Sequence, residues 1–341
     1  MGIFLSILIY FFGIHGTINE FIFEDMTKKN ITTIILAFVS VGIIIFIAAD
    51  LWSSINSFRE RPNRNFVQNK IQVATSFYPI YFFAQQIGGD KANILDITPV
   101  GLSPHDYQPT SQEMTTIENS NLVILNGLGL EPWSDSAQNI TEKKNIIVIF
   151  ASGNLSESQV LESEKDKVDP HIWLSPAMAK QMTDKILEGF LQADSKNADY
   201  YKANANKLKL ELDKLATKYK NGLVNCQDKN IVTSHGAFAY LAKDYGLNQI
   251  LIVGLSSSAE PSSQQLTNIA EFVKKESVKY IFVENSDNLG IANNMAAKAG
   301  VKILVLNPIE SLTQGQLKTG KNYFTEMDSN LANLKTALQC Q

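Results

Sequence analysis

The sequence predicts an α/β protein with two lobes, each a mostly parallel four-stranded sheet flanked by helices, joined by one long rigid helix. Three observations support this prediction: short apolar runs that alternate with helical stretches, a long amphipathic pattern between two groups of such runs, and a length of 341 residues. At about 150 residues per domain, this length suits two domains or lobes. An N-terminal membrane segment is expected to precede them.

Residues 1–70 are expected to form a signal or membrane anchor followed by a polar stalk. Residues 31–49 carry no charge and are long enough to span a bilayer, whereas the apolar residues 3–14 are too short. Lys28 and Lys29 precede the longer stretch, so a chain that starts at Met26 instead of Met1 would begin with a signal sequence. The alternative is that both apolar stretches are membrane segments.

An uncleaved anchor is expected, because Ile47 is a poor match three positions from a cut placed after Ala49; release after signal cleavage is the alternative. The region contains no cysteine, which excludes a lipid anchor of the lipobox type within it. Positively charged residues that flank a span usually stay on the cytoplasmic side, and four cationic residues after the span oppose export: Arg59, Arg61, Arg64 and Lys70.

The rest of the chain contains two groups of four apolar runs, a pattern typical of parallel strands covered by helices on both faces. The first group comprises residues 71–77, 94–100, 122–126 and 146–150. The second group comprises residues 231–234, 250–253, 280–284 and 303–306. We therefore expect an N-terminal lobe over residues 71–194 and a C-terminal lobe over residues 223–341.

A long linking helix is predicted over residues 195–222. Apolar side chains recur there at steps of four and three, which places them on one stripe of a helix: Tyr201, Ala205, Leu208, Leu212, Leu215 and Tyr219. Asp194 or Ser195 is expected to cap its start, and Gly222 to end it. A second helix with Pro176 in its first turn is expected to precede it. A helix of about 27 residues is roughly 40 Å long, which suits a rigid connection between two lobes.

The composition excludes some classes of protein and of metal site. Hydrophobic residues make up 45% and charged residues 19% of the chain, which is ordinary globular usage, and the net charge of −4 disfavours a nucleic-acid binder. Cys226 and Cys340 are too few for a cysteine-only zinc site. In an oxidising compartment they are expected to form a disulfide that ties down the C-terminus.

Three histidines lie in loops or at the ends of predicted strands. His105 follows the second apolar run, His171 lies in the loop before Pro176, and His235 ends the fifth run. Ligands of open α/β sheets bind beyond the carboxyl ends of the strands. Because imidazole suits zinc and its neighbours in the periodic table, a shared metal site is expected.

A tetrahedral zinc site needs a fourth ligand, and three glutamates are candidates. Glu310 lies just past the last apolar run, Glu284 ends the seventh, and Glu260 precedes a helical stretch that it would more readily cap. Asp106 and Asp169 are placed to orient the neighbouring histidines without binding the metal themselves.

From residue 73 to the C-terminus, six segments resemble the solute-binding proteins of zinc and manganese ABC importers, the zinc-uptake (ZnuA-like) and TroA-like group. In order, they are residues 104–110 (Pro-His-Asp-Tyr-Gln-Pro-Thr), 126–133 (Asn-Gly-Leu-Gly-Leu-Glu-Pro-Trp), 169–173 (Asp-Pro-His-Ile-Trp), 234–235 (Ser-His), 259–262 (Ala-Glu-Pro-Ser) and 320–324 (Gly-Lys-Asn-Tyr-Phe). The resemblance implies two α/β lobes joined by a long helix, with one metal ion in the cleft. The ligand positions of the family fall on four residues of this chain: His105, His171, His235 and Glu310.

The chain departs from the family in two places. Zinc-uptake members often carry a histidine-rich loop between the first two ligand histidines, but residues 152–168 are acidic and contain no histidine. A metal-feeding role for this loop is therefore not expected. Manganese members often end their ligand set with aspartate and replace the third histidine by a carboxylate, whereas this chain has Glu310 and keeps His235. Three nitrogen ligands and one carboxylate favour Zn²⁺ over Mn²⁺.

We predict that the chain is not an enzyme but a monomeric, extracytoplasmic solute-binding protein of the periplasm or the cell surface. It is expected to capture Zn²⁺ between its lobes and to deliver it to an ABC permease. The alternatives are a Mn²⁺-specific member of the same group, a surface adhesin of the kind described for some relatives, and a zinc hydrolase. The absence of a His-Glu-x-x-His pattern disfavours the hydrolase.

Overall fold

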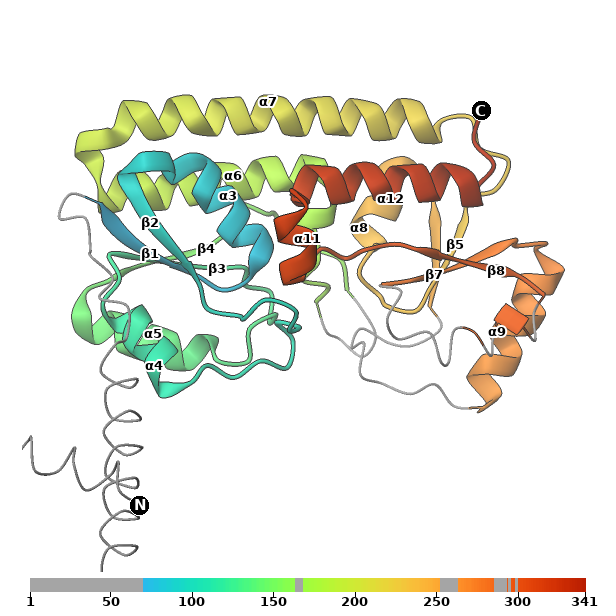
Figure 1. Ribbon diagram of the computed structural model, residues 1–341, viewed down its shortest axis with the longest axis horizontal. Helices are drawn as coiled ribbons and strands as arrows, with labels where there is room; N and C mark the ends of the chain where they lie inside the picture. The colour runs from blue at the N-terminus through green and yellow to red at the C-terminus, as the bar shows by residue number, and fades with distance from the viewer. Residues whose placement is uncertain (1–69, 163–167, 252–262, 285–292, 294–295, 298–299) are drawn as a thin grey trace, which may run out of the picture. The chain divides into compact units, whose positions relative to one another are not determined.

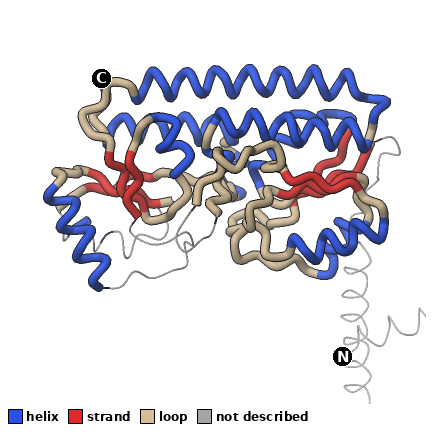
Figure 2. Tube along the Cα trace, turned by 180° about the vertical axis from the view of Figure 1, so that it is seen from behind, coloured by secondary structure: helices blue, strands red, loops and turns tan. Residues whose placement is uncertain are grey.

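The computed structural model describes residues 70–162, 168–251, 263–284, 293, 296–297 and 300–341. All of them belong to one unit of the chain, Val67–Gln341. They form two four-stranded sheets that lie side by side beneath one long helix (Figures 1 and 2). The predicted membrane segment, residues 31–49, lies outside the described residues. Within the described part of the chain, no helix is long and apolar enough to cross a membrane.

The first sheet consists of four parallel strands in the order β2-β1-β3-β4. The strands are β1 (Ile71–Thr75), β2 (Ala92–Asp96), β3 (Leu122–Leu125) and β4 (Ile147–Phe150). Two layers of helix flank it: α3 (Tyr78–Gly88) and α6 (Pro176–Ala193) on one side, and α4 (Ser111–Glu118) and α5 (Ser134–Lys144) on the other. A short 3-10 turn, η1 (Gly89–Lys91), links α3 to β2. Successive strand residues point to opposite faces. Val73 accordingly packs in the core with α3 and α6, while Ala74 packs in the core with α4 and α5.

The second sheet repeats this order, as β6-β5-β7-β8, and is also parallel. The strands are β5 (Asn230–Thr233), β6 (Asn248–Leu251), β7 (Tyr280–Val283) and β8 (Lys302–Val305). The helices around it are α8 (Ala239–Tyr245), α9 (Ser263–Lys275), α11 (Gln314–Lys318) and α12 (Tyr323–Ala337). We call each sheet with its helices the first and the second lobe. The prediction of two parallel four-stranded sheets flanked by helices is thus confirmed.

The strands coincide with the predicted apolar runs, with shifted ends. The largest shift at a strand start is two residues, in β2 and β6. β2 begins at Ala92 because the register of the sheet pairs Ala92 with Ile71, the first residue of β1. Gln72 also accepts a hydrogen bond from Asn93 at 2.7 Å. A polar residue such as Asn93 therefore joins the strand through pairing that periodicity does not reveal.

Helix α7 (Ala198–Leu223) crosses both sheets (Figure 1). Its 26 residues span about 39 Å. It packs on α3 and α6 of the first lobe and on α8 and α12 of the second. The predicted stripe of six apolar side chains is buried throughout. The stripe therefore predicts the contact face of the helix correctly.

The predicted ends of α7 are wrong. A 3-10 turn, η4 (Ser195–Asn197), separates α6 from α7, and Asp194 accepts hydrogen bonds from Asn197 and Tyr201 instead of capping α7. Gly222 lies inside the last turn, where a side chain would meet Leu331 at 3.2 Å. The glycine thus permits the close approach of α12. Helix α6 does begin at Pro176, as predicted, and Ser175 caps it.

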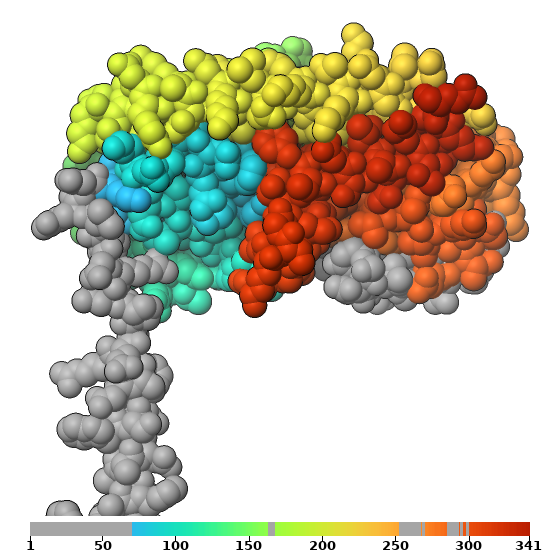
Figure 3. Space-filling model, turned by 45° about the horizontal axis from the view of Figure 1, so that its top comes forward, coloured from blue at the N-terminus to red at the C-terminus, as the bar shows by residue number. Residues whose placement is uncertain are grey.

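The two lobes share one hydrophobic core. Phe82 and Phe83 of α3 pack against Tyr323 of α12, with ring centroids 5.9 and 4.9 Å apart. Trp173, in the 3-10 turn η3 (Ile172–Leu174), donates to the Pro308 carbonyl at 2.7 Å, and its own carbonyl accepts from the Tyr323 hydroxyl at 2.6 Å. In Figure 3 the red C-terminal segment accordingly lies against the cyan part of the first lobe. Buried contacts therefore join the lobes in addition to α7.

A disulfide between Cys226 and Cys340 closes the second lobe, as predicted. Cys226 precedes β5, and Cys340 follows α12. The backbone N–H of Gln341 donates to the Asn225 carbonyl at 3.1 Å beside it. The C-terminus is thus tied to the start of the second sheet.

Candidate metal site

His105 lies in the loop between β2 and α4, and the start of α4 holds this loop in place. Thr110 and Glu113 form a capping box there, and the Tyr107 hydroxyl donates to the Glu113 carboxylate at 2.6 Å. The hydrogen bond from Tyr107 therefore fixes the loop two residues after His105. The side chain of His105 is 16% exposed, which makes it the most accessible of the three histidines.

His171 lies between β4 and η3 and is fully buried. The Asn126 side chain, at the end of β3, donates to the Pro170 carbonyl at 3.0 Å and anchors the segment. Asp169 Oδ1 accepts from the backbone N–H of His171 at 2.9 Å and lies 2.7 Å from its Nδ1. A carboxylate on Nδ1 fixes the ring and leaves Nε2 to bind a metal.

His235 and Glu310 come from the second lobe and follow β5 and β8. The His235 carbonyl accepts from the Thr233 hydroxyl at 2.8 Å. Ile309, just before Glu310, has a φ of 59°, a left-handed conformation that costs a β-branched residue on the order of 1–3 kcal/mol. Asn307 Oδ1 accepts from the Ile309 N–H at 2.8 Å and stabilises this turn.

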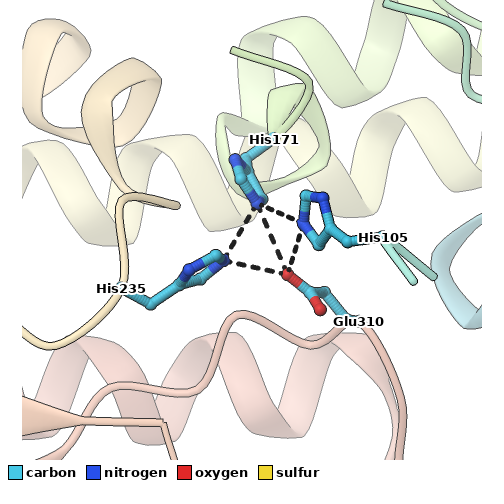
Figure 4. Close-up of side chains that lie close together, drawn as sticks. All are labelled: His105, His171, His235 and Glu310. Atoms are coloured by element: carbon cyan, nitrogen blue, oxygen red, sulfur yellow. Dashed lines mark hydrogen bonds and ion pairs between the residues drawn. The ribbon is translucent and has the colours of Figure 1, made fainter. Parts of the chain in front are cut away.

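The four predicted side chains converge (Figure 4). The Nε2 atom of His171 lies 3.1 Å from Nε2 of His105 and 3.1 Å from Nε2 of His235. Glu310 Oε1 lies 3.2, 3.4 and 3.1 Å from the Nε2 atoms of His105, His171 and His235. With zinc–ligand bonds of about 2.0–2.1 Å, the ligand atoms of a tetrahedral zinc site lie about 3.3 Å apart. These five distances match that spacing, and all four ligand atoms lie within 4.8 Å of one another.

The charges in the cluster are coupled. Burial by itself would raise the pKa of Glu310, but hydrogen bonds from the three imidazoles hold it well below its usual range. Burial by itself would lower the pKa of His171, but the carboxylates of Asp169 and Glu310 raise it to about 9. Burial lowers the pKa of His235. Without metal, the site thus stores a proton on His171, which a divalent cation would replace.

The other carboxylates that the sequence offers do not belong to the cluster of four ligand atoms. Glu284 Oε1 is 3.8 Å from His235 Nδ1, on the side of the ring away from the cluster, and burial raises the Glu284 pKa to about 7. Asp106 is exposed and has no contact with His105 among the described residues, so its predicted orienting role is wrong. Asp169 does orient its histidine. Glu260 lies outside the described residues, as do residues 163–167 of the acidic loop.

The sequence carries no signal for one contact of the site. The Ser103 hydroxyl donates to Glu310 Oε2 at 3.1 Å and accepts from the backbone N–H of His105 at 3.4 Å. A serine near a histidine is not a metal-binding signal by itself, and Glu310 lies 207 residues further along the chain. Only the folded chain brings the two together.

Comparisons with known proteins agree with this geometry. The model of the family described as "Zinc-uptake complex component A periplasmic" matches residues 73–337. The zinc-binding lipoprotein AdcA of Streptococcus pneumoniae is 36% identical over 290 residues, which cover 80% of this chain and 57% of AdcA. The high-affinity zinc uptake system protein ZnuA of Bacillus subtilis is 32% identical over 281 residues, which cover 79% of this chain and 88% of ZnuA.

A solved structure extends the likeness to the fold. The crystal structure of the Zn(II)-bound ZnuA-like domain of Streptococcus pneumoniae AdcA matches with a TM-score of 0.71 and 35% identity, over 79% of this chain and 99% of that one. The residues matched by the family include both sheets and all four clustered side chains. The match to AdcA as a whole, however, spans little more than half of that protein.

Proposed function

This chain belongs to the zinc-uptake complex component A family, the solute-binding proteins of zinc importers, and on this premise we propose that it captures Zn²⁺ and delivers it to an ABC permease. The observation that carries the proposal is the convergence of three imidazole nitrogens and one carboxylate oxygen within 4.8 Å of one another. His105 and His171 come from the first lobe, and His235 and Glu310 from the second. One bound ion would therefore tie the lobes together.

The ligand set favours zinc over manganese. Imidazole nitrogen suits zinc, whereas manganese prefers carboxylate, carbonyl and water oxygens and six-fold coordination. The cluster offers three nitrogens and a single oxygen, all within 4.8 Å of one another. The protein thus supplies only one of the oxygen ligands that Mn²⁺ prefers. Zn²⁺ is accordingly the proposed cargo.

The number of candidate ligands favours a binding protein over an enzyme. A hydrolytic zinc site keeps one position open for water, with three protein ligands. Here four side chains are placed to act as ligands, and three of them are less than a tenth exposed. We therefore propose a carrier that does no chemistry on its ligand, rather than a zinc hydrolase. Because one chain supplies every ligand, it would act as a monomer.

An extracytoplasmic location follows from two further observations. The Cys226–Cys340 disulfide requires an oxidising compartment to persist. The family is described as periplasmic, and AdcA is named a lipoprotein. We propose residues 1–70 as membrane anchor and stalk, with residues 31–49 as the span. The lobes would comprise residues 71–194 and 223–341, with residues 195–222 between them.

Calorimetric titration of the metal-stripped full chain tests the proposal. One tight equivalent of Zn²⁺, with Mn²⁺ bound much more weakly, is the expected result. His15→Ala serves as a matched control for variants of the clustered histidines, because it removes the one histidine that has no assigned role. Tighter binding of Mn²⁺ would place the chain in the manganese branch, and binding of neither ion would refute the proposal.

A further inference from the structure

The loop before His105 touches the segment that carries Glu310 at two points. The Ser103 hydroxyl donates to Glu310 Oε2 at 3.1 Å. The backbone N–H of Gly101 donates to the hydroxyl of Ser311 at 2.5 Å. Both hydrogen bonds join the first lobe to the second beside the four clustered side chains. Only the one from Ser103 reaches a clustered side chain.

The two oxygens of Glu310 are engaged differently. Oε1 faces the three imidazole Nε2 atoms at 3.1–3.4 Å. Oε2 points away from them, as Figure 4 shows, and receives the hydroxyl of Ser103. The serine is itself oriented, because its oxygen accepts from the N–H of His105 at 3.4 Å and its hydrogen is thereby directed at Oε2.

We propose that Ser103 is a positioning residue that keeps Glu310 a one-oxygen ligand and thereby makes the site selective for Zn²⁺ over Mn²⁺. The inference rests on the proposed function and adds which residue limits the coordination number of the bound ion. A carboxylate that rotates can offer both oxygens to one ion and turn a four-coordinate site into a five-coordinate one. Zinc is satisfied by four ligands, whereas Mn²⁺ gains from each added oxygen. By holding Oε2, the serine withholds the fifth ligand.

Three variants of the full chain separate this role from mere contact between the lobes. Ser103→Ala removes the donor to Oε2, Ser103→Thr keeps a hydroxyl there, and Ser311→Ala removes only the neighbouring contact. Each metal-stripped protein is titrated with Zn²⁺ and with Mn²⁺ to obtain the affinity ratio. Each is also loaded with Co²⁺, whose visible absorption is intense in four-coordinate sites and weak in five- or six-coordinate ones. Circular dichroism verifies folding.

The expected result is specific to the hydroxyl. Ser103→Ala should weaken the Co²⁺ absorption, lower Zn²⁺ affinity by about 10-fold or more, as is typical for partners of metal ligands, and lower the Zn²⁺-to-Mn²⁺ affinity ratio. Ser103→Thr and Ser311→Ala should keep the parent spectrum and ratio. A parent-like Ser103→Ala, or equal changes in Ser103→Ala and Ser311→Ala, would overturn the inference. Failure of the parent itself to bind Zn²⁺ or Co²⁺ would instead overturn the proposed function.

Discussion

The two lobes have the same sheet order but support their clustered side chains differently. In the first lobe, Asp169 lies 2.7 Å from Nδ1 of His171. In the second lobe, Nδ1 of His235 has no hydrogen-bond partner among the described residues, and the Glu284 carboxylate is 3.8 Å away. Glu310, also in the second lobe, is held by Ser103 of the first.

Equal topology therefore does not produce equal sites. The first lobe orients His171 with its own Asp169. Glu310 of the second lobe instead receives a hydrogen bond from Ser103 of the first lobe. A ligand that is already oriented loses less freedom when the metal binds. Outer contacts in the first lobe should consequently contribute more to metal affinity than those in the second.

Loss of His171 is the largest expected effect. His171→Ala removes a proposed ligand and leaves the buried Asp169 carboxylate without its ring partner. Zinc affinity should fall by more than the roughly 100-fold upper limit typical of outer partners. Competition with a chelator of known affinity measures the loss, and the His15→Ala variant should bind like the parent. A loss below about 10-fold would contradict the assignment of the ligand, since outer partners alone account for that much.

Outer carboxylates give the next largest effect and sharpen the comparison of the lobes. Asp169→Asn removes the charge behind His171 while keeping the shape, and should lower zinc affinity about 10- to 100-fold. Glu284→Gln is the matched change behind His235, and should cost less because Glu284 lies beyond hydrogen-bond distance. The same competition titration compares the two variants. If the cost of Glu284→Gln equals or exceeds that of Asp169→Asn, the lobes do not differ as proposed.

The pH dependence of zinc binding tests the same asymmetry. Zinc binds neutral imidazole, and the pKa of His171 is raised to about 9 by Asp169 and Glu310. Below that pH, zinc must displace one proton, so affinity should fall by up to about tenfold per pH unit as the pH is lowered from 9 to 7. His235 adds nothing in this range because burial lowers its pKa. Titrations in buffers of different ionisation enthalpy count the released protons. Binding that does not change between pH 7 and 9 would contradict the prediction.

The disulfide should have the smallest effect on zinc binding, although it stabilises the fold. Cys226 and Cys340 are 114 residues apart, and loss of a native disulfide typically lowers the free energy of unfolding by about 2–5 kcal/mol. The double variant Cys226→Ser, Cys340→Ser should therefore unfold at lower denaturant concentration while its zinc affinity changes less than about tenfold, below the range for partners of metal ligands. The parent under reducing conditions is the matched control. A larger loss of affinity would show that the cluster depends on this tie.

Local patterns predicted the regular elements well because buried strands and long helices leave strong periodic signals. The stripe from Tyr201 to Tyr219 identified the buried face of α7. The start of α7 could not be predicted in the same way, because the Asp194 carboxylate can accept hydrogen bonds either from the backbone of the helix or from other side chains. A carboxylate at that position suits a helix cap, but in the folded chain the Tyr201 hydroxyl reaches it at 2.7 Å.

The order of residues already indicates which side chains are suited to bind a metal: three histidines near predicted strand ends and, through the family resemblance, Glu310. The outer contacts that orient them arise from the folding of the chain. Asp106 and Asp169 look alike beside their histidines, yet one is exposed and the other lies 2.7 Å from a ring nitrogen. Ser103 meets Glu310 across 207 residues of sequence. Chemical type is a property of each residue, whereas contact between distant residues depends on how the whole chain packs.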